Sequence, residues 1–263
     1  PGKAAWMIAH ALYMFPDVSG RVVAVEQRGK SVSTFLPLLD PTFLDKPHLE
    51  QGAAPEQIAA LRPDAILLKS YLANQLGTPL EKLGFPVIAV DLETPNTFFR
   101  DIATLGQLLG NEERAQEITD YYQGKLDYIA AGLEGLEDTN RPTVLVLQYK
   151  PQGEDIALQI PSASYMQTIQ VEIAGGDPIW TKAAEAGGWT TVNFEQIAAW
   201  DADIILVVAF RADAGQVVTH LESDPIWQAL RAVQNEKIYA FPEDLYGWDL
   251  PDPLYSGFKG VPG

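Results

Sequence analysis

The chain has 263 residues, 47% hydrophobic and 20% charged, which is typical of a folded globular protein with one large domain or two lobes. Its net charge of −17 argues against a general nucleic-acid or anionic-membrane binder, because such proteins need a basic surface. The absence of cysteine excludes disulfides, thiolate metal sites, iron–sulfur clusters and cysteine nucleophiles. No apolar run reaches the ~18 residues of a membrane span. The chain opens at Pro1 without an initiator Met or a signal peptide, and we expect a processed or trimmed polypeptide.

Helix and strand patterns alternate through the first 110 residues. Alternation of this kind predicts a parallel sheet with helices on its faces. The expected helices are residues 3–15, 55–63, 80–84 and 97–109. The expected strands are residues 21–26, 64–69 and 86–91, and residues 70–75 are expected to form a loop.

Residues 111–136 predict one long amphipathic helix near the middle of the chain. Asn111 is a favourable N-cap, and Glu112 and Glu113 lie in the first turn, where the helix dipole favours acids. Apolar residues recur at spacings of three and four. At ~1.5 Å per residue the helix is longer than one small domain needs, and we interpret it as a strut between two lobes.

The second half of the sequence alternates as the first does. Strands are expected at residues 143–149, 203–210 and 237–241, and helices at 163–176, 193–200 and 224–233. The predicted fold is therefore α/β: two Rossmann-like lobes with parallel sheets, joined by a single long backbone helix, with a ligand cleft between the lobes. The predicted boundaries are 1–110 for the N-terminal lobe, 111–136 for the linking helix and 137–263 for the C-terminal lobe.

An internal repeat supports two similar lobes. Residues 55–68 align without a gap to residues 194–207, an offset of 139, and share the five residues EQIAA. Asp64 stands opposite Asp203, and an apolar strand follows each. Coincidence between two helix–strand units of common composition is the alternative.

Several stretches resemble the solute-binding proteins of ABC importers, in the helical-backbone class that carries iron-siderophores, haem, cobalamin and, in one branch, molybdate or tungstate. They include APEQIAALRPDAILL, VNFEQIAAWDADIILVV, DPIWQALRAVQNEKIYAFP and the LGQLLGNEERA passage that leads into the long helix. The resemblance implies a periplasmic or extracellular protein, an ABC permease as partner, and a monomer. It also implies an export signal with a lipid-anchored cysteine in the full-length protein, and neither is among these residues.

Two departures from the family stand out. Its members usually have a strand before the first helix, and here only Pro1 and Gly2 precede it. They usually finish with an amphipathic helix, whereas residues 252–263 are rich in Gly and Pro. We therefore expect a missing first strand and an altered C-terminal lobe.

Candidate ligand-binding residues follow the predicted strands, because ligands of open α/β sheets bind outside the carboxyl ends of the strands. Arg and Lys follow four of these strands in an otherwise acidic chain, which predicts a small anionic ligand or metal chelate. Aromatic residues could form apolar walls, and ordinary solvated loop residues are the alternative. The candidates are Arg28, Lys69, Tyr71, Tyr149, Lys150, Arg211, Tyr246 and Trp248.

Glu56 and Glu195 occupy equivalent places in the repeat, each near the start of a helix. A favourable charge at a helix N-terminus explains them equally well. By resemblance, one exposed glutamate on each lobe docks onto arginines of the permease.

No catalytic motif is present: the sequence lacks GxGxxG, GxxxxGK[ST], GxSxG and HExxH. We therefore predict no catalytic residues, no cofactor and no metal site, and a protein that is not an enzyme. The predicted function is capture of an anionic metal chelate and its delivery to an ABC permease. The alternatives are a molybdate- or tungstate-binding protein of the same fold, an enzyme with an interlobe cleft, and a structural or adhesive module.

Overall fold

The computed structural model describes residues 5–26, 36–50, 52–152, 155–209 and 213–241. The described chain divides into two compact units, one up to Gln123 and one from Gly124 onward. The boundary falls inside α6 (Glu112–Gly132), so this helix carries the chain from the first unit into the second.

The first unit contains two short parallel sheets with helices around them. β1 (Val25–Glu26) pairs with β2 (His48–Leu49), and β3 (Ile66–Lys69) pairs with β4 (Val87–Val90). The helices are α1 (Ala5–Leu12), α2 (Leu36–Leu39), α3 (Pro55–Ala59), α4 (Thr78–Lys82) and α5 (Pro95–Leu109).

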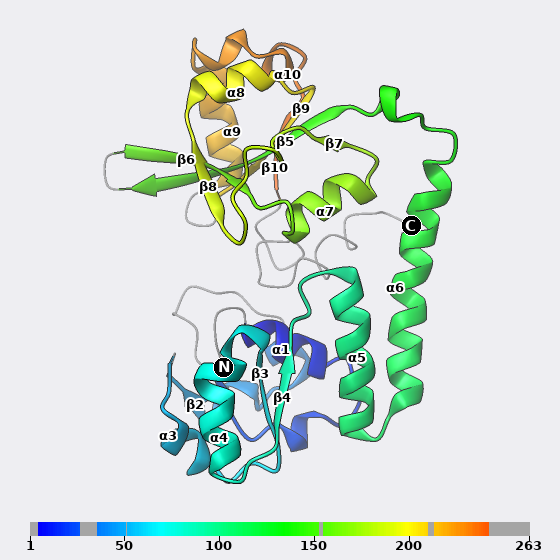
Figure 1. Ribbon diagram of the computed structural model, residues 1–263, viewed down its shortest axis with the longest axis vertical. Helices are drawn as coiled ribbons and strands as arrows, with labels where there is room; N and C mark the ends of the chain where they lie inside the picture. Colours follow the sequence, from blue (N-terminus) through cyan, green and yellow to red (C-terminus); the bar gives the residue numbers. More distant parts are fainter. Residues whose placement is uncertain (1–4, 27–35, 51, 153–154, 210–212, 242–263) are drawn as a thin grey trace. The chain divides into compact units, whose positions relative to one another are not determined.

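Helices α5 and α6 form an antiparallel hairpin (Figure 1). Gly110 ends α5 in the left-handed conformation, with a φ of 68° that glycine adopts without strain. Gly106 lets the two helices approach closely, because a Cβ added there would lie 2.6 Å from the Cβ of Ala115. Ile118 and Tyr122 continue the buried face of α6.

The second unit is built on one six-stranded sheet of order β10-β9-β5-β6-β8, in which β7 also pairs with β5. Its strands are β5 (Thr143–Gln152), β6 (Asp155–Pro161), β7 (Asp177–Pro178), β8 (Trp189–Val192), β9 (Ile204–Val208) and β10 (Ile238–Ala240). The helices are α7 (Met166–Ile173), α8 (Phe194–Trp200), α9 (Ala214–Ser223) and α10 (Arg231–Gln234). Trp180 is fully buried in the core, and its indole N–H donates to the Pro161 carbonyl at 2.8 Å.

The predicted α/β class with parallel sheets is confirmed, but several local predictions differ from the structure, among them the strand expected at residues 21–26, which is observed only at Val25–Glu26. Residues 70–75 were expected to form a loop, but they lie in two helical turns, η3 (Ser70–Leu72) and η4 (Ala73–Gly77). Strand β5 continues to Gln152 and forms an antiparallel hairpin with β6 (Figure 1), so this sheet is mixed. Helix α9 was not predicted, and the helix expected at 224–233 is interrupted at Leu230, which has an extended ψ of 139°.

A buried polar network joins the residue that follows α1, Tyr13, to the residue that follows α2, Asp40. Asp40, 2% exposed, accepts hydrogen bonds from the Tyr13 hydroxyl at 2.5 Å and from the Thr42 backbone N–H and hydroxyl at 2.9 and 2.7 Å. Lys46 Nζ lies 3.4 Å from the same carboxylate. The hydrogen bond from Tyr13, more than any other contact, holds the pKa of Asp40 well below its ordinary value. Burial, followed by this hydrogen bond to Asp40, raises the pKa of Tyr13.

We expect Asp40→Asn to lower the melting temperature of the protein at neutral pH and the loss to shrink in acid. Because the folded state lowers the pKa of Asp40, the stabilisation is present above the unfolded pKa of about 3.9 and is lost as pH falls through the folded pKa. Thermal unfolding from pH 7 to pH 3 measures the difference. Asp45→Asn, at a nearby exposed position, is the control, and equal losses at both pH extremes would contradict the role of Asp40.

Candidate functional site

The carboxyl ends of β3 and β4 bring Lys69 together with two acids. The Lys69 side chain is fully buried, and its Nζ lies 2.6 Å from Glu93 Oε1 and 3.8 Å from Asp91 Oδ1. It also donates to the Asp91 carbonyl and lies 3.9 Å from the sulfur of Met7. The charge of this predicted ligand-binding residue is therefore compensated within the first unit.

Asp101, from the buried face of α5, fixes the turn that holds these acids. Its carboxylate, 2% exposed, accepts from the backbone N–H groups of Asp91 at 2.5 Å and Leu92 at 2.9 Å. Leu92 has a φ of 61°, a left-handed conformation that costs a non-glycine residue free energy and needs such support. Arg100 Nε donates to the other oxygen of Asp101 at 2.8 Å.

Sequence reasoning missed Asp91 and Asp101 as part of this site. The sequence offered one sign of a buried carboxylate, an acidic residue on the apolar face of a helix, since Asp101 stands between Phe98 and Leu105 on the buried side of α5.

The edge around Lys69 presents carboxylates to solvent, because the Asp91 and Glu93 side chains are 34% and 46% exposed. Tyr71, 56% exposed, lies in η3, two residues after Lys69 in the chain.

Tyr149 and Lys150 both lie within strand β5, which continues to Gln152, whereas the predicted strand ended at Tyr149. In the hairpin Tyr149 stands opposite Leu158 and Lys150 opposite Ala157. Because successive side chains of a strand point to opposite faces, these two residues cannot both face one ligand. Tyr149 is half-buried, and burial raises its pKa. Lys150 is exposed.

Glu56 and Glu195 occupy matching positions in the two units. Each is the second residue of its helix, α3 or α8, and each is exposed. Two residues further on, Ile58 and Ile197 are buried at 3% and 1% exposure. The two helix N-termini differ in detail: Asn193 Oδ1 accepts from the Gln196 N–H at 2.8 Å, whereas the Gln57 side chain accepts from the Ala54 N–H at 2.8 Å. Both helices lead into parallel strands, β3 and β9, as the repeat predicted.

Four predicted ligand-binding residues, Arg28, Arg211, Tyr246 and Trp248, lie outside the described residues. The described part of the chain contains no cluster of three or more His, Asp or Glu residues that could hold a metal ion. It also contains no helix long and apolar enough to cross a membrane. His10 is buried on α1, with its ring edge-on to Trp6 at 6.3 Å between centroids.

Two curated proteins resemble the chain along most of its length. The molybdate-binding protein MolA of Haemophilus influenzae is 22% identical over 233 residues, which cover 79% of this chain and 64% of MolA. The iron-uptake system-binding protein of Bacillus subtilis is 22% identical over 205 residues, which cover 77% of this chain and 60% of that protein. The chain thus spans less than two thirds of the length of either relative.

Solved structures share the fold. An ABC transporter solute-binding protein from Sulfurospirillum deleyianum superposes with a TM-score of 0.76 at 22% identity, covering 97% of this chain and 79% of that one. The siderophore-binding protein FeuA of B. subtilis, solved with ferri-bacillibactin, gives a TM-score of 0.68 at 18% identity, covering 97% of this chain and 86% of that one. The family model described as "Periplasmic binding protein" matches residues 40–245.

Proposed function

Since the chain belongs to the periplasmic binding protein family, we propose that it captures an anionic metal chelate outside the cytoplasm and delivers it to the permease of an ABC importer. The substrate class is an organic chelate of the iron-siderophore, haem or cobalamin type. The chain acts as a monomer and as a carrier, without catalysis. The choice of ligand rests on one observation: two partly exposed carboxylates, Asp91 and Glu93, lie around the charge-compensated Lys69.

Two carboxylates beside one ammonium leave the β3–β4 edge negatively charged. A bare molybdate or tungstate dianion at this edge would meet like charge. An organic chelate can instead direct hydroxyl or amide donors to Asp91 and Glu93 and pack an apolar part on Tyr71. Its acidic groups then pair with arginine or lysine residues, as the candidate cations of the sequence predict.

Oxyanion binding is the second candidate. It is favoured by the resemblance to MolA, a protein named for molybdate, and by the forked hydrogen bonds that Arg28 and Arg211 could make to tetrahedral anions.

Glu56 and Glu195 supply the contact with the permease in this proposal. Both carboxylates are exposed on the first turn of equivalent helices in the two units. A pair of matching acids suits a partner made of two transmembrane subunits, each presenting arginines, because arginine binds carboxylates in bidentate fashion.

We expect the ligand and permease contacts to separate by mutation. Arg211→Ala should weaken chelate binding by about 10- to 100-fold, the value of one or two hydrogen bonds to a charged group. Glu56→Ala and Glu195→Ala should leave that binding constant unchanged and weaken association with permease in nanodiscs. Calorimetry and a pull-down on the same three variants measure both effects. An unchanged binding constant in Arg211→Ala would remove this residue from the site.

A further inference from the structure

A row of polar side chains crosses the sheet of the second unit, where β5, β6 and β8 are neighbours (Figure 1). Gln148 of β5 stands directly opposite Gln159 of β6, and Gln159 stands directly opposite Thr191 of β8. Because paired residues of neighbouring strands point to the same face of a sheet, these three side chains form one row on one face. Gln148 comes directly after residues 144–147, which are all buried and apolar.

The two glutamine side chains of this polar row are buried without a full set of hydrogen bonds. Gln148 is 8% exposed and Gln159 is 9% exposed. Gln159 Nε2 donates to the Thr191 hydroxyl at 3.1 Å, which leaves its other N–H and its carbonyl oxygen. The Gln148 carboxamide forms no hydrogen bond with any residue in the described ranges. Most buried polar side chains have a partner, so a carboxamide held in this way calls for an explanation.

Aromatic rings border the polar row on one side and a cation borders it on the other. Trp189 lies two residues before Thr191 on β8 and therefore on the same face. Its ring lies edge-on to that of Tyr165, the residue before α7, with 6.4 Å between the centroids. Lys150, two residues after Gln148 on β5, is exposed and also belongs to this face.

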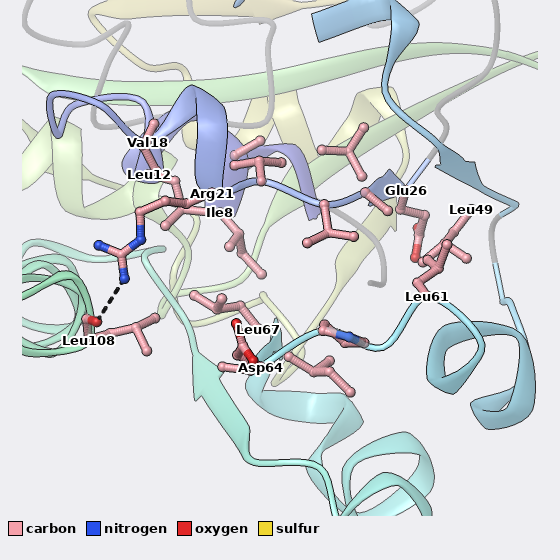
Figure 2. A pocket seen from close by; sticks show the side chains of 18 of the residues that line it. Ile8, Leu12, Val18, Arg21, Glu26, Leu49, Leu61, Asp64, Leu67 and Leu108 are labelled. Carbon is pink, nitrogen blue, oxygen red and sulfur yellow. Dashed lines mark hydrogen bonds between the residues drawn. The ribbon is translucent and has the colours of Figure 1, made fainter.

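The cavity of the first unit is of a different kind. It has a volume of about 460 Å³, and the side chains that line it are mostly apolar (Figure 2). Arg21, one of its charged residues, donates to the carbonyls of Leu108 and Leu109 at 3.4 and 2.9 Å. This cavity suits apolar groups, whereas a ligand with hydrogen-bonding groups matches the polar row of the second unit.

A group that carries both a hydrogen-bond donor and an acceptor completes the polar row. A glutamine carboxamide has N–H donors and an oxygen acceptor side by side, so an amide group of a ligand can pair with it at two points. Carboxylates and oxyanions are acceptors alone and would leave a glutamine oxygen without a partner. The neighbouring aromatic rings suit the apolar part of an organic ligand, and Lys150 suits an acidic group.

We infer that Gln148 and Gln159 bind an amide group of the ligand, so that the protein selects organic chelates that carry amides. The inference rests on the proposed function and narrows its ligand class. Siderophores with amide linkages and cobalamin, with its amide side groups, belong to the selected class. Haem does not, because its polar side groups are carboxylates. Trp189 packs against the apolar part next to the amide, and Lys150 pairs with an acidic group of the same ligand.

N-methylacetamide tests the site without any chelate. In the amide NMR spectrum of the whole chain, we expect millimolar N-methylacetamide to shift the side-chain signals of Gln148 and Gln159 in a saturable way. Methyl acetate is the matched probe, because it has the same shape with an oxygen in place of the N–H donor, and it should give a much smaller shift. Equal responses to the two probes, or a response to neither, would overturn the inference.

The variant Gln148→Met separates a ligand-binding role from a structural one. It removes a buried carboxamide that lacks a partner, so the melting temperature should stay the same or rise. It should weaken binding of an amide-bearing chelate by about tenfold, the value of two hydrogen bonds between neutral groups. Gln216→Met, at an exposed position of α9, is the control and should change neither quantity. A lower melting temperature with unchanged chelate affinity in Gln148→Met would show a structural role and overturn the inference.

Calorimetry with an amide-linked ferric siderophore, cobalamin and haemin separates this inference from the proposed function. We expect one of the two amide-bearing chelates to bind. Saturable binding of haemin alone would overturn the inference and leave the proposed function standing. If no chelate binds while N-methylacetamide still shifts the signals of Gln148 and Gln159, the proposed function fails and the amide-binding site stands.

Discussion

Glu93→Ala is expected to destabilise the protein by about 3 kcal/mol, because it leaves a buried ammonium without its nearest carboxylate. Lys69 is fully buried and lies 2.6 Å from Glu93, whereas Asp91 is farther away at 3.8 Å. Lys69→Met removes the buried charge and keeps most of the volume. The carboxylates left behind are 34% and 46% exposed and remain hydrated, so this variant should cost about 1 kcal/mol or less.

Urea unfolding of the two single variants and of the double variant measures this coupling. Once Lys69 is Met, the further change Glu93→Ala should cost almost nothing, so the two effects are strongly non-additive. A larger cost for Lys69→Met than for Glu93→Ala would contradict this account, since the methylenes of Lys69 would then matter more than its charge.

Asp203→Ala is expected to cost about 2–3 kcal/mol, because one carboxylate serves three donors. These are the N–H and hydroxyl of Thr143 at 2.9 and 2.8 Å and the Arg231 guanidinium at 2.8 Å. The hydrogen bond from the Thr143 backbone, ahead of the other contacts, lowers the pKa of Asp203. The loss of stability in Asp203→Ala should therefore be complete above the unfolded-state pKa of about 3.9. It should decline as pH falls through the lower pKa that Asp203 has in the folded state.

Asp64→Ala is the matched comparison, since the repeat places Asp64 opposite Asp203. In the chain of 263 residues it should change the free energy of unfolding by less than about 0.5 kcal/mol, as exposed surface substitutions usually do. Chemical denaturation at pH 7 and pH 4 compares the two variants. Equal losses of unfolding free energy in Asp203→Ala and Asp64→Ala at pH 7 would show that the hydrogen bonds of Asp203 to Thr143 do not stabilise the protein.

Local patterns predicted much of the fold. Helix α6 was expected at residues 111–136 and is observed at Glu112–Gly132, because its caps and apolar spacing agree. Apolar runs predicted strands β3, β4, β9 and β10, whereas the strand expected at residues 21–26 is observed only as β1 (Val25–Glu26). The β5–β6 hairpin was not predicted, since the apolar run ends at Tyr149, and pairing with β6 carries the strand on through Lys150.

The candidate site was less predictable, because pairing over long sequence separations decides what a charge does. Lys69 was identified as a cation that follows a strand, but burial and the distant Glu93 determine its environment. Glu56 and Glu195 were found through the repeat, and their exposure agrees with a docking role. Asp101 was missed because its partners, the N–H groups of Asp91 and Leu92, belong to a turn that sequence patterns do not specify.

Isothermal titration calorimetry of the purified chain against a ligand panel determines which class of ligand the protein binds. The panel contains a ferric siderophore, haemin and cobalamin, together with molybdate and tungstate. We predict saturable binding of one chelate at about micromolar affinity or tighter, near −8 kcal/mol, and no binding of either oxyanion. Saturable binding of molybdate or tungstate with no response to any chelate would contradict it, because the carboxylates of Asp91 and Glu93 would then not determine the class of ligand.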